Sequence, residues 1–513
     1  LSAFLSPASN KRNDAYGGPL ENRARFLMEV LEATKRRVGK DFPVWCRIDA
    51  TELETQGGIC FEDAKRTAEW AEAAGADAIH VSAYADPMKG HAFTQAPLVH
   101  TPMGFVDYAA GIKKCVTIPV IAVGRIDPDE AEQVISQGKA DFVAMGRKLL
   151  ADPDLPNKLK ENHPEDVRPC IYCYVCVGEI FLNRGLRCAV NPSTGREFEV
   201  IEERSMTAPS PTKEVLVIGA GPAGMETARI AALRGHRVTL VEKSEQMGGT
   251  LFFASLAYEA NTQLVRWLET QVRKLPIELK LGCEATPERV KKLDPDAIVV
   301  AVGARRQRPA LPGMERPLVY SGDDLRQLFS GGRDSGGRGK LNVFQRILIA
   351  AGRLIGATKN VDRIRKLTRL WMPLGKRVTL IGGGLVGIEL AEFLLERGRE
   401  VTVLEESKNL ASSMSVPRRW RSLHALRSHQ VRLETEARVE AIEEGAVAWR
   451  NAAGERETHP ADAVILASGT EANPGLGEAL QKDFSEVHLI GDCSGLGYIE
   501  GALADAARIG RKL

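Results

Sequence analysis

A glycine pattern that occurs twice limits the fold of this 513-residue chain more than any other feature. Each copy follows a short apolar run and opens a helix-like run, and a glutamate ends the next apolar run. The glycines are Gly219, Gly221 and Gly224 in the first copy and Gly382, Gly384 and Gly387 in the second, and the glutamates are Glu242 and Glu405. This order predicts two strand, turn, helix and strand units of the type that binds dinucleotides.

Each glycine of the first copy has a physical role in such a unit. Gly219 permits the tight turn, Gly221 lets a diphosphate approach the start of the helix, and Gly224 lets the helix pack on the strand. Glu242, at the end of the second strand, is expected to accept hydrogen bonds from the adenosine ribose.

The second copy indicates which nicotinamide dinucleotide it takes. A carboxylate at Glu405 favours the free ribose 2′-hydroxyl of NADH and repels the 2′-phosphate of NADPH, so we expect NADH. Arg399 lies close in the sequence and leaves NADPH as a minority alternative.

Four cysteines lie just before the first glycine pattern. They are Cys170, Cys173, Cys176 and Cys188, with the spacing C-x2-C-x2-C-x11-C. Three thiolates from one tight loop and one from a later turn can surround a [4Fe-4S] cluster. Structural zinc is the alternative, although zinc sites usually combine two separated C-x2-C pairs, and a disulfide framework is a third. The other five cysteines are scattered and are expected to be reduced core or loop residues.

The first 165 residues alternate apolar runs with amphipathic stretches. The predicted strands are FPVWCRIDA, ADAIHVSAY, IPVIAVGRI and ADFVAMGRKLL, with helices at 61–75 and 128–138. This alternation predicts parallel strands, and four such units make half of a (β/α)8 barrel. Half a barrel would expose its interior, and the chain begins at Leu1, so we expect the N-terminal half of the barrel to be missing.

Composition excludes several classes of protein. The net charge of +2 is too small to indicate a nucleic-acid partner. No apolar run is long enough for a transmembrane helix, and the N-terminus has no signal-peptide pattern. Nine cysteines used in this way indicate a reducing compartment, so we expect a cytoplasmic protein.

The opening segment LSAFLSPASNKRNDAYGGPLENRARF resembles the old yellow enzyme family after its fourth barrel strand. The cysteine loop and the two nucleotide modules resemble the larger branch of that family, which contains 2,4-dienoyl-CoA reductases, 2-enoate reductases and trimethylamine dehydrogenase. The resemblance implies FMN in the barrel, a [4Fe-4S] cluster, FAD in the first module and a nicotinamide site in the second. The expected fold class is therefore α/β: half a TIM barrel, an iron–sulfur loop and two Rossmann-like domains.

This organisation predicts domain limits. The half barrel covers 1–165, the four-cysteine segment 166–205, the FAD domain 206–313 with 465–513, and the NAD(P)H domain 314–464. A basic insertion at about 331–374 is expected to form an amphipathic helix that packs over the second domain, with a membrane-surface or partner-docking helix as the alternative.

The resemblance also implies binding residues for FMN. Arg47 matches the arginine near the flavin pyrimidine, where a cation stabilises negative charge on the reduced flavin. The phosphate grip of the family matches Gly124 and Arg125 after the seventh barrel strand and Gly146 and Arg147 after the eighth.

Substrate-side and FAD residues follow from the same resemblance. His91 is the nearest candidate for a histidine that assists protonation, in a loop that also offers Asp86 and Tyr84. Gly491 and Asp492 match the motif that closes the FAD site, and Gly249 continues the dinucleotide contact. Glu389 is expected either near the nicotinamide or as a charge on the helix face.

The sequence therefore predicts an oxidoreductase that passes electrons from NADH through FAD and the cluster to FMN and reduces an α,β-unsaturated carbonyl compound. One alternative is an amine dehydrogenase that exports electrons to an electron-transfer flavoprotein, since C-x2-C-x2-C is closer to trimethylamine dehydrogenase. A non-enzymatic nucleotide-binding or electron-shuttling subunit is the other. The expected partner is a small-molecule substrate, and a homo-oligomer stays open.

Overall fold

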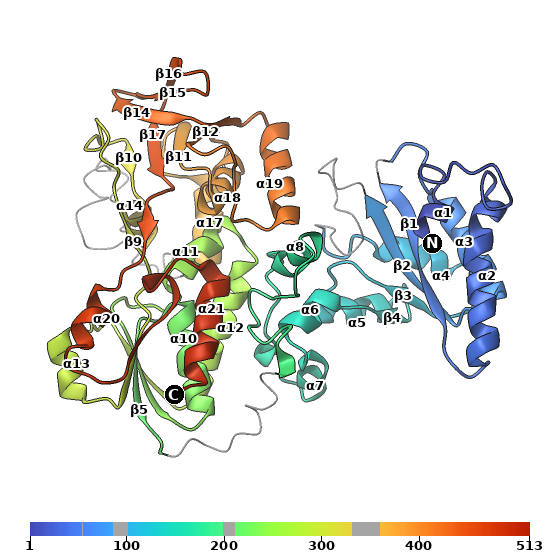
Figure 1. Cartoon of the computed structure of the whole chain (residues 1–513), viewed down its shortest axis with the longest axis horizontal. Coiled ribbons are helices and arrows are strands. Elements are labelled where there is room, and N and C mark those ends of the chain that lie inside the picture. Colours follow the sequence, from blue (N-terminus) through green and yellow to red (C-terminus); the bar gives the residue numbers. More distant parts are fainter. Residues whose placement is uncertain (54, 86–100, 199–210, 331–359) are drawn as a thin grey trace. The chain divides into compact units, whose positions relative to one another are not determined.

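The computed structural model describes residues 1–53, 55–85, 101–198, 211–330 and 360–513. The chain forms two compact units, Leu1–Gly146 and Arg147–Leu513 (Figure 1). Each unit is built around its own parallel sheets.

The first unit contains four parallel strands in the order β1-β2-β3-β4. The strands are β1 (Trp45–Leu53), β2 (Ala78–Ala85), β3 (Val120–Ala122) and β4 (Phe142–Val143). The helices are α1 (Ser2–Leu5), α2 (Leu20–Val38), α3 (Phe61–Ala73), α4 (Val106–Lys113) and α5 (Pro128–Ser136). Strand and helix alternate in the way that the apolar pattern predicted, and the α/β fold class is confirmed.

The two faces of this sheet differ in chemistry. Ile48, Ile79 and Val81 point to one face and are buried in a core shared with α2, α3 and α4. Because side chains alternate along a strand, Arg47 and His80 point to the other face.

The last predicted strand is much shorter than expected. Only Phe142 and Val143 pair with β3, and Gly146–Ala151 forms the helix α6. The residues after Gly146 include arginine, lysine, leucine and alanine, which all favour helix, so helix propensity ends the strand early.

The first nucleotide module of the second unit has a parallel sheet in the order β19-β8-β5-β6-β7. Its strands are β5 (Glu214–Ile218), β6 (Arg237–Glu242), β7 (Ile277–Leu281), β8 (Ala297–Val300) and β19 (Val487–Leu489). Its helices are α10 (Pro222–Leu233), α11 (Gly249–Ala257), α12 (Asn261–Lys274), α13 (Pro287–Leu293), α20 (Gly475–Leu480) and α21 (Tyr498–Gly510), and η4 (Gly491–Cys493) precedes α21. The last strand and α21 come from the C-terminus, which returns to this sheet after the second module.

The second module repeats the arrangement with a parallel sheet in the order β10-β17-β11-β12-β13. Its strands are β10 (Val319–Tyr320), β11 (Arg377–Ile381), β12 (Glu400–Glu405), β13 (Arg432–Thr435) and β17 (Ala463–Leu466). Its helices are α14 (Gly322–Ser330), α17 (Val361–Leu370), α18 (Leu385–Leu395) and α19 (Val416–Ser428). An antiparallel sheet of β14 (Arg438–Glu443), β15 (Ala446–Arg450) and β16 (Arg456–Pro460) extends it, and β9 (Arg305–Arg306) pairs with β18 (Thr470–Glu471) where the chain crosses between modules.

The predicted insertion falls partly outside the described residues, which omit 331–359. Its described helix α17 buries Val361 and Ile364 in the core of the second module and packs against α11. Arg365 on the same helix donates hydrogen bonds to the Ser255 carbonyl and the Thr262 hydroxyl. The described part of the insertion is therefore packed on the protein.

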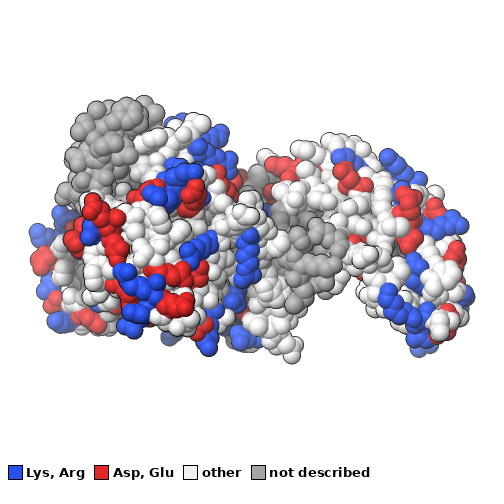
Figure 2. Space-filling model, turned by 90° about the horizontal axis from the view of Figure 1, so that it is seen from above, with Lys and Arg blue, Asp and Glu red and all other residues white. Residues whose placement is uncertain are grey.

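The four-cysteine segment contains the short helix α8 (Val175–Phe181), and the helix α7 (Leu155–Lys160) and the turn η2 (Pro164–Asp166) lead into it. In Figure 1, α8 lies beside α19 of the second module. The described surface in Figure 2 carries interspersed basic and acidic side chains. Among the described helices, none is long and apolar enough to cross a membrane.

Candidate functional site

The two glycine turns have the same geometry. A Cβ added to Gly224 would lie 1.8 Å from the Gly219 carbonyl oxygen, and one added to Gly387 would lie 2.0 Å from that of Gly382. Gly219 and Gly382 have φ of +104° and +109°, a region that only glycine adopts readily. These glycines bring each helix directly onto its strand.

The middle glycines face open space. No heavy atom lies within 4 Å of a Cβ built on Gly221 or on Gly384, and both residues are N-caps of their helices, α10 and α18. A helix N-terminus with free room in front of it suits a diphosphate, because unpaired amides and the helix dipole attract anions. Both turns therefore fit a dinucleotide.

The two glutamates at the strand ends are held by backbone amides beside these turns. Glu242 accepts hydrogen bonds from the amides of Ala220 and Ser244, each at 2.8 Å. Glu405 accepts from the amides of Gly383 at 2.6 Å and Ser407 at 2.9 Å. The duplication thus extends from the glycines to the hydrogen bonds of the carboxylates.

Two further predicted residues lie close to the first turn. A Cβ on Gly249 would come 3.1 Å from the Cα of Gly221, and a Cβ on Gly491 would come 3.0 Å from the Cβ of Ala223. Asp492 accepts hydrogen bonds from the amides of Gly497 at 2.9 Å and Tyr498 at 3.1 Å, at the start of α21. The C-terminal motif therefore meets the helix that begins at the first glycine turn.

Arg399 is remote from Glu405. It precedes β12, whereas Glu405 ends that strand, so about 20 Å of extended chain separates their α-carbons. The Arg399 guanidinium donates instead to the Met372 carbonyl oxygen at 3.4 Å. This arrangement leaves Glu405 without a compensating cation from Arg399.

The barrel half carries the residues predicted for FMN. Arg47 and His80 are partners in the register of β1 and β2, and the Nε2 atom of His80 is buried without a hydrogen-bond partner. Burial and then the charge of Arg47 lower the pKa of His80 to about 4. A neutral imidazole with an unsatisfied buried nitrogen beside a guanidinium fits a polar ligand on this face.

The other predicted FMN residues lie where the chain leaves β3 and β4. Gly124 and Arg125 form a turn with φ of +120° and +53°. Gly146 begins α6, is exposed and has no heavy atom within 4 Å of an added Cβ. His91 and Asp86 lie outside the described residues, and Tyr84 lies on β2.

Arg147 contacts the cysteine loop directly. Its guanidinium lies 5.1 Å from the ring centre of Tyr172 and 4.9 Å from that of Tyr174, the two residues that flank Cys173. Burial alone would lower the pKa of Arg147, but Tyr174 and Cys170 outweigh it and raise the pKa. The arginine predicted at the FMN phosphate is therefore also packed on the four-cysteine loop.

The cysteine loop has an unusual backbone. Tyr172 and Tyr174 have φ of +49° and +62°, so two bulky residues adopt left-handed conformations around Cys173. Such conformations cost free energy and persist where the surrounding structure imposes them. The two left-handed residues therefore bend the chain on both sides of Cys173, within the stretch that contains Cys170, Cys173 and Cys176.

The four thiols lie in one partly buried group. Burial raises the pKa of Cys173 and Cys188, and it raises the pKa of Cys176 to about 11. Each of these cysteines interacts electrostatically with Cys170, so the four form one group. Four thiolates at this place would need a cationic metal centre to compensate their charge, and the donor set fits such a centre.

The described residues also contain a group of possible metal ligands outside the cysteine loop. The ligand atoms of His163, Glu165 and Asp166 lie within 4.8 Å of one another.

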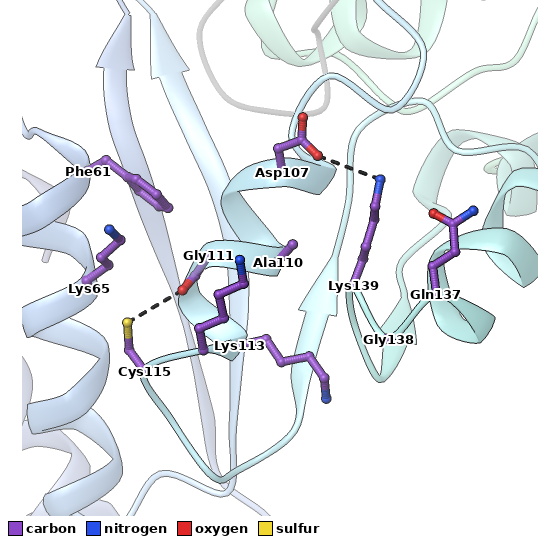
Figure 3. Close-up of a pocket in the computed structure, with 11 residues that line it drawn as sticks. Phe61, Lys65, Asp107, Ala110, Gly111, Lys113, Cys115, Gln137, Gly138 and Lys139 are labelled. Carbon is purple, nitrogen blue, oxygen red and sulfur yellow. Dashed lines mark hydrogen bonds and ion pairs between the residues drawn. The ribbon is translucent and has the colours of Figure 1, made fainter.

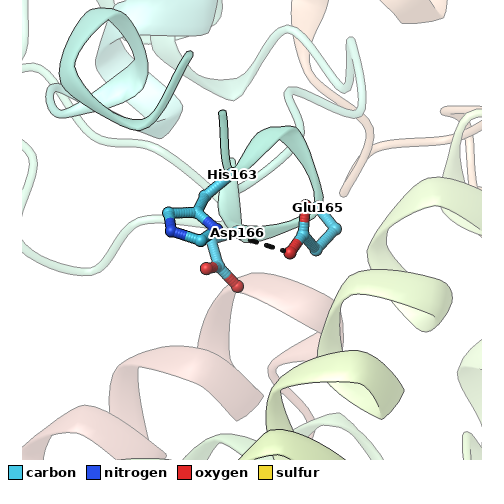
Figure 4. Close-up of side chains that lie close together, drawn as sticks. All are labelled: His163, Glu165 and Asp166. Atoms are coloured by element: carbon cyan, nitrogen blue, oxygen red, sulfur yellow. Dashed lines mark ion pairs between the residues drawn. The ribbon is translucent and has the colours of Figure 1, made fainter. Parts of the chain in front are cut away.

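Two other features are not candidate sites. The Lys274 ammonium forms ion pairs with Glu165 at 2.5 Å and with Asp166 at 2.9 Å. The carboxylates of the group in Figure 4 are therefore already paired with a lysine side chain. The lysine-rich pocket in Figure 3 lies among α3, α4 and the turn after α5. It is on the helical side of the sheet, away from the face of Arg47 and His80.

Comparisons with known proteins agree with this geometry. Residues 1–166 match the NADH:flavin oxidoreductase / NADH oxidase family, and residues 213–490 match the pyridine nucleotide-disulphide oxidoreductases. The chain is 34% identical to the NADH oxidase of Thermoanaerobacter brockii over 99% of its own length and 72% of the relative's. The chain belongs to the NADH:flavin oxidoreductase / NADH oxidase family. The predicted resemblance and fold class are thereby confirmed.

Other members of this family are similar over the whole chain. The cinnamate reductase of Clostridium sporogenes is 30% identical over 100% of this chain and 72% of its own. A solved structure of 2-naphthoyl-CoA reductase with 2-naphthoyl-CoA superposes with a TM-score of 0.86 and 31% identity over 100% of this chain and 71% of its own. This flavin oxidoreductase therefore shares its architecture with reductases of unsaturated acids and thioesters.

Several residues at the site were not found from the sequence. His80, on the same face as Arg47, has no motif around it. The same is true of Arg168, which donates to the Val190 carbonyl oxygen near Cys188, and of Tyr258 and Arg418, since Arg418 packs on the Tyr258 ring and the Tyr258 hydroxyl donates to the Tyr172 carbonyl oxygen. Glu226 had a usable signal, because it lies two residues after Gly224, as Glu389 lies two residues after Gly387.

Proposed function

We propose that the protein is an NADH-dependent reductase of α,β-unsaturated carbonyl compounds, with electrons passing from NADH through FAD and a [4Fe-4S] centre to FMN. The enoate or enoyl-thioester substrate class rests on the cinnamate and 2-naphthoyl-CoA reductases, which match the whole chain. Family membership favours an enzyme over a non-enzymatic shuttle subunit.

One observation carries the proposal: the four-cysteine loop contacts both nucleotide modules. Ser415, just before α19, donates to the Cys173 carbonyl oxygen at 3.1 Å. Arg168, just before the loop, pairs with Glu226 on α10 at 2.8 Å. A metal centre in a loop anchored to the first module could accept single electrons from a flavin bound there and pass them on, since a flavin can exchange single electrons with a metal centre.

The assignment of each group follows the residues present. FAD is proposed for Gly219, Gly221, Gly224, Glu242, Gly249, Gly491 and Asp492, NADH for Gly382, Gly384, Gly387 and Glu405, the cluster for the four cysteines, and FMN for Arg47, Gly124, Arg125, Gly146 and Arg147. We propose the domain limits given above for the FMN, cluster, FAD and NADH parts of the chain. The separation of Arg399 from Glu405 supports NADH over NADPH.

The chain's own residues supply positioning and charge. At the strand ends, backbone amides hold the carboxylates of Glu242 and Glu405, which can accept hydrogen bonds from ribose hydroxyls. Beside the proposed flavin face, Arg47 places a positive charge where negative charge develops on reduction. His91 is retained as the proposed proton donor to the substrate.

The test is anaerobic reduction of the full-length protein, with iron, sulfide and released flavins quantified. We expect about four iron atoms, one FMN and one FAD per chain. NADH should bleach the visible absorbance of the flavins, and cinnamate or an enoyl thioester should restore it. Bleaching by an amine but not by NADH would move the protein to the amine dehydrogenases, whose electrons leave through an electron-transfer flavoprotein.

A further inference from the structure

Glu226 and Glu389 occupy the same position in the two copies of the nucleotide module. Each lies two residues after the third glycine, on α10 and on α18, and both side chains are buried. A buried carboxylate needs a partner, and neither residue is required by the glycine turn itself. Each glutamate pairs with an arginine near the cysteine loop.

The first pair joins α10 to both arms of the loop. Arg168 binds Glu226 at 2.8 Å and lies two residues before Cys170. Its other guanidinium nitrogen donates to the carbonyl oxygen of Val190, two residues after Cys188. One arginine therefore ties the beginning and the end of the cysteine segment to the first module.

The second pair reaches the loop from the other module. Arg418 on α19 binds Glu389 at 2.8 Å, and its guanidinium lies 3.6 Å from the ring centre of Tyr258. The Tyr258 hydroxyl donates to the Tyr172 carbonyl oxygen at 2.9 Å. The charge of Arg418 therefore lies against the part of the loop that contains Cys173.

Each arginine reaches a different part of the cysteine segment. Arg168 donates to the Val190 carbonyl oxygen near Cys188, whereas Arg418 packs on the Tyr258 ring, whose hydroxyl donates to the backbone beside Cys173. In both places the glutamate lies on a helix of a nucleotide module, and its arginine links that helix to the cysteine segment.

We propose that Glu226–Arg168 and Glu389–Arg418 are two anchor pairs, produced by the module duplication, that hold the cysteine loop and set the reduction potential of its metal centre. The inference rests on the proposed function, because it requires a redox centre at these cysteines. The glutamates and arginines are positioning residues and do not touch a reacting substrate.

The proposal predicts that arginine and glutamate variants shift the reduction potential of the centre in opposite directions. The arginine is the charge that links to the cysteine segment, and a positive charge there favours the extra negative charge of the reduced centre. Removing the arginine takes away this stabilising positive charge, so reduction becomes harder. Removing the glutamate charge leaves the arginine uncompensated, so reduction becomes easier. A purely structural role would not give opposite signs.

The test is an anaerobic redox titration of the full-length protein, followed by EPR of the reduced centre. For Arg168→Gln and Arg418→Gln we expect the ratio of reduced to oxidised centre at a fixed potential to fall roughly tenfold, which is about 59 mV for one electron. For Glu226→Gln and Glu389→Gln we expect the potential to rise. Arg418→Lys keeps the charge and should stay near wild type.

Two arginines provide matched controls. Arg229 also binds Glu226 at 2.8 Å and faces the same Trp267 ring as Arg168, but it lies on α10 and not beside the cysteines. Arg397 is as buried as Arg418 and lies just after α18, where it donates to the Phe393 carbonyl oxygen and the Thr368 hydroxyl. In Arg229→Gln and Arg397→Gln, the ratio of reduced to oxidised centre at the same fixed potential should change by less than about twofold.

The outcomes separate the inference from the proposed function. Wild-type protein without iron and sulfide overturns the proposed function, and this inference with it. Wild-type protein with a centre whose potential is unchanged in all four anchor variants, or moves in one direction in all of them, overturns the inference alone. If an arginine variant loses the centre, the glutamate variants and Arg418→Lys still decide the sign.

Discussion

Gly224 has no room for a side chain because of Gly219: an added Cβ would meet the Gly219 carbonyl oxygen at 1.8 Å. The same contact recurs between Gly387 and Gly382 at 2.0 Å. Two turns so alike within one chain show that the sequence duplication is also a structural one. Predictions about one module can therefore be checked in the other.

Substitution of the third glycine should damage the fold, whereas substitution of the second should damage binding. Gly224→Ala forces the helix away from its strand, and we expect a loss of about 3 kcal/mol of stability. Gly221→Ala adds a methyl group in open space, so thermal stability should stay near wild type while FAD content falls. Thermal unfolding and flavin analysis of both variants test this; equal melting temperatures would contradict it.

Glu405 should decide between the two nicotinamide dinucleotides. Glu405→Gln removes the charge that repels a 2′-phosphate, so the kcat/KM ratio of NADPH to NADH should rise about tenfold. Arg399→Gln is the control, since Arg399 bonds Met372 and precedes the strand that Glu405 ends. Steady-state kinetics with both dinucleotides measure the ratio, and a larger change in the Arg399 variant would refute the assignment.

Loss of one loop cysteine should remove the metal. In Cys176→Ser we expect iron to fall from about four atoms per chain to well below one, because a buried serine is a poor ligand for the centre. Cys115→Ser changes a cysteine outside the loop whose thiol donates to the Gly111 carbonyl oxygen, and iron should be retained. Equal iron in the two variants would exclude the loop as the binding site. Zinc in place of iron in the wild type would favour the structural alternative.

Stability should depend on pH through Glu226. Burial alone would raise the pKa of Glu226, but Arg168 and Arg229 lower it from 4.5 to about 2. A carboxyl whose pKa is lower in the folded state stabilises the fold above pH 4.5 and loses this contribution as pH falls toward 2.

The comparison of wild type with Glu226→Gln isolates this effect. We expect wild type to be more stable by about 3 kcal/mol at pH 7, where the variant leaves buried arginines unpaired. The difference should be constant down to pH 5 and shrink below pH 4.5. Melting temperatures across pH 7 to 3.5 measure it, and a difference that grows toward low pH would show that the sign is wrong.

The parts of the fold set by local patterns could be predicted from the sequence. The βα alternation of the first 165 residues and both glycine turns depend on apolar period and on glycine chemistry, and both appear in the structure. The run at 140–150 was wrong as a single strand, because apolar content does not distinguish a short strand followed by helix from one longer strand.

Contacts between distant segments could not be predicted. Arg418 lies in an arginine-rich stretch that reads as an exposed helix face, yet it is buried against Glu389 and Tyr258. The alternative of Glu389 as a helix-face charge was wrong for the same reason, since the residue is only 7% exposed. Which arginine turns inward is decided by how α19 packs, which the sequence pattern does not contain.

The most direct test of the account is low-temperature EPR of the full-length protein, frozen after anaerobic mixing with NADH. Electron relay through the four-cysteine loop predicts the signal of a reduced [4Fe-4S] centre with NADH, and its absence in Cys176→Ser. A wild-type sample that gives this signal with dithionite but stays silent with NADH, while its flavins are reduced, would contradict the account.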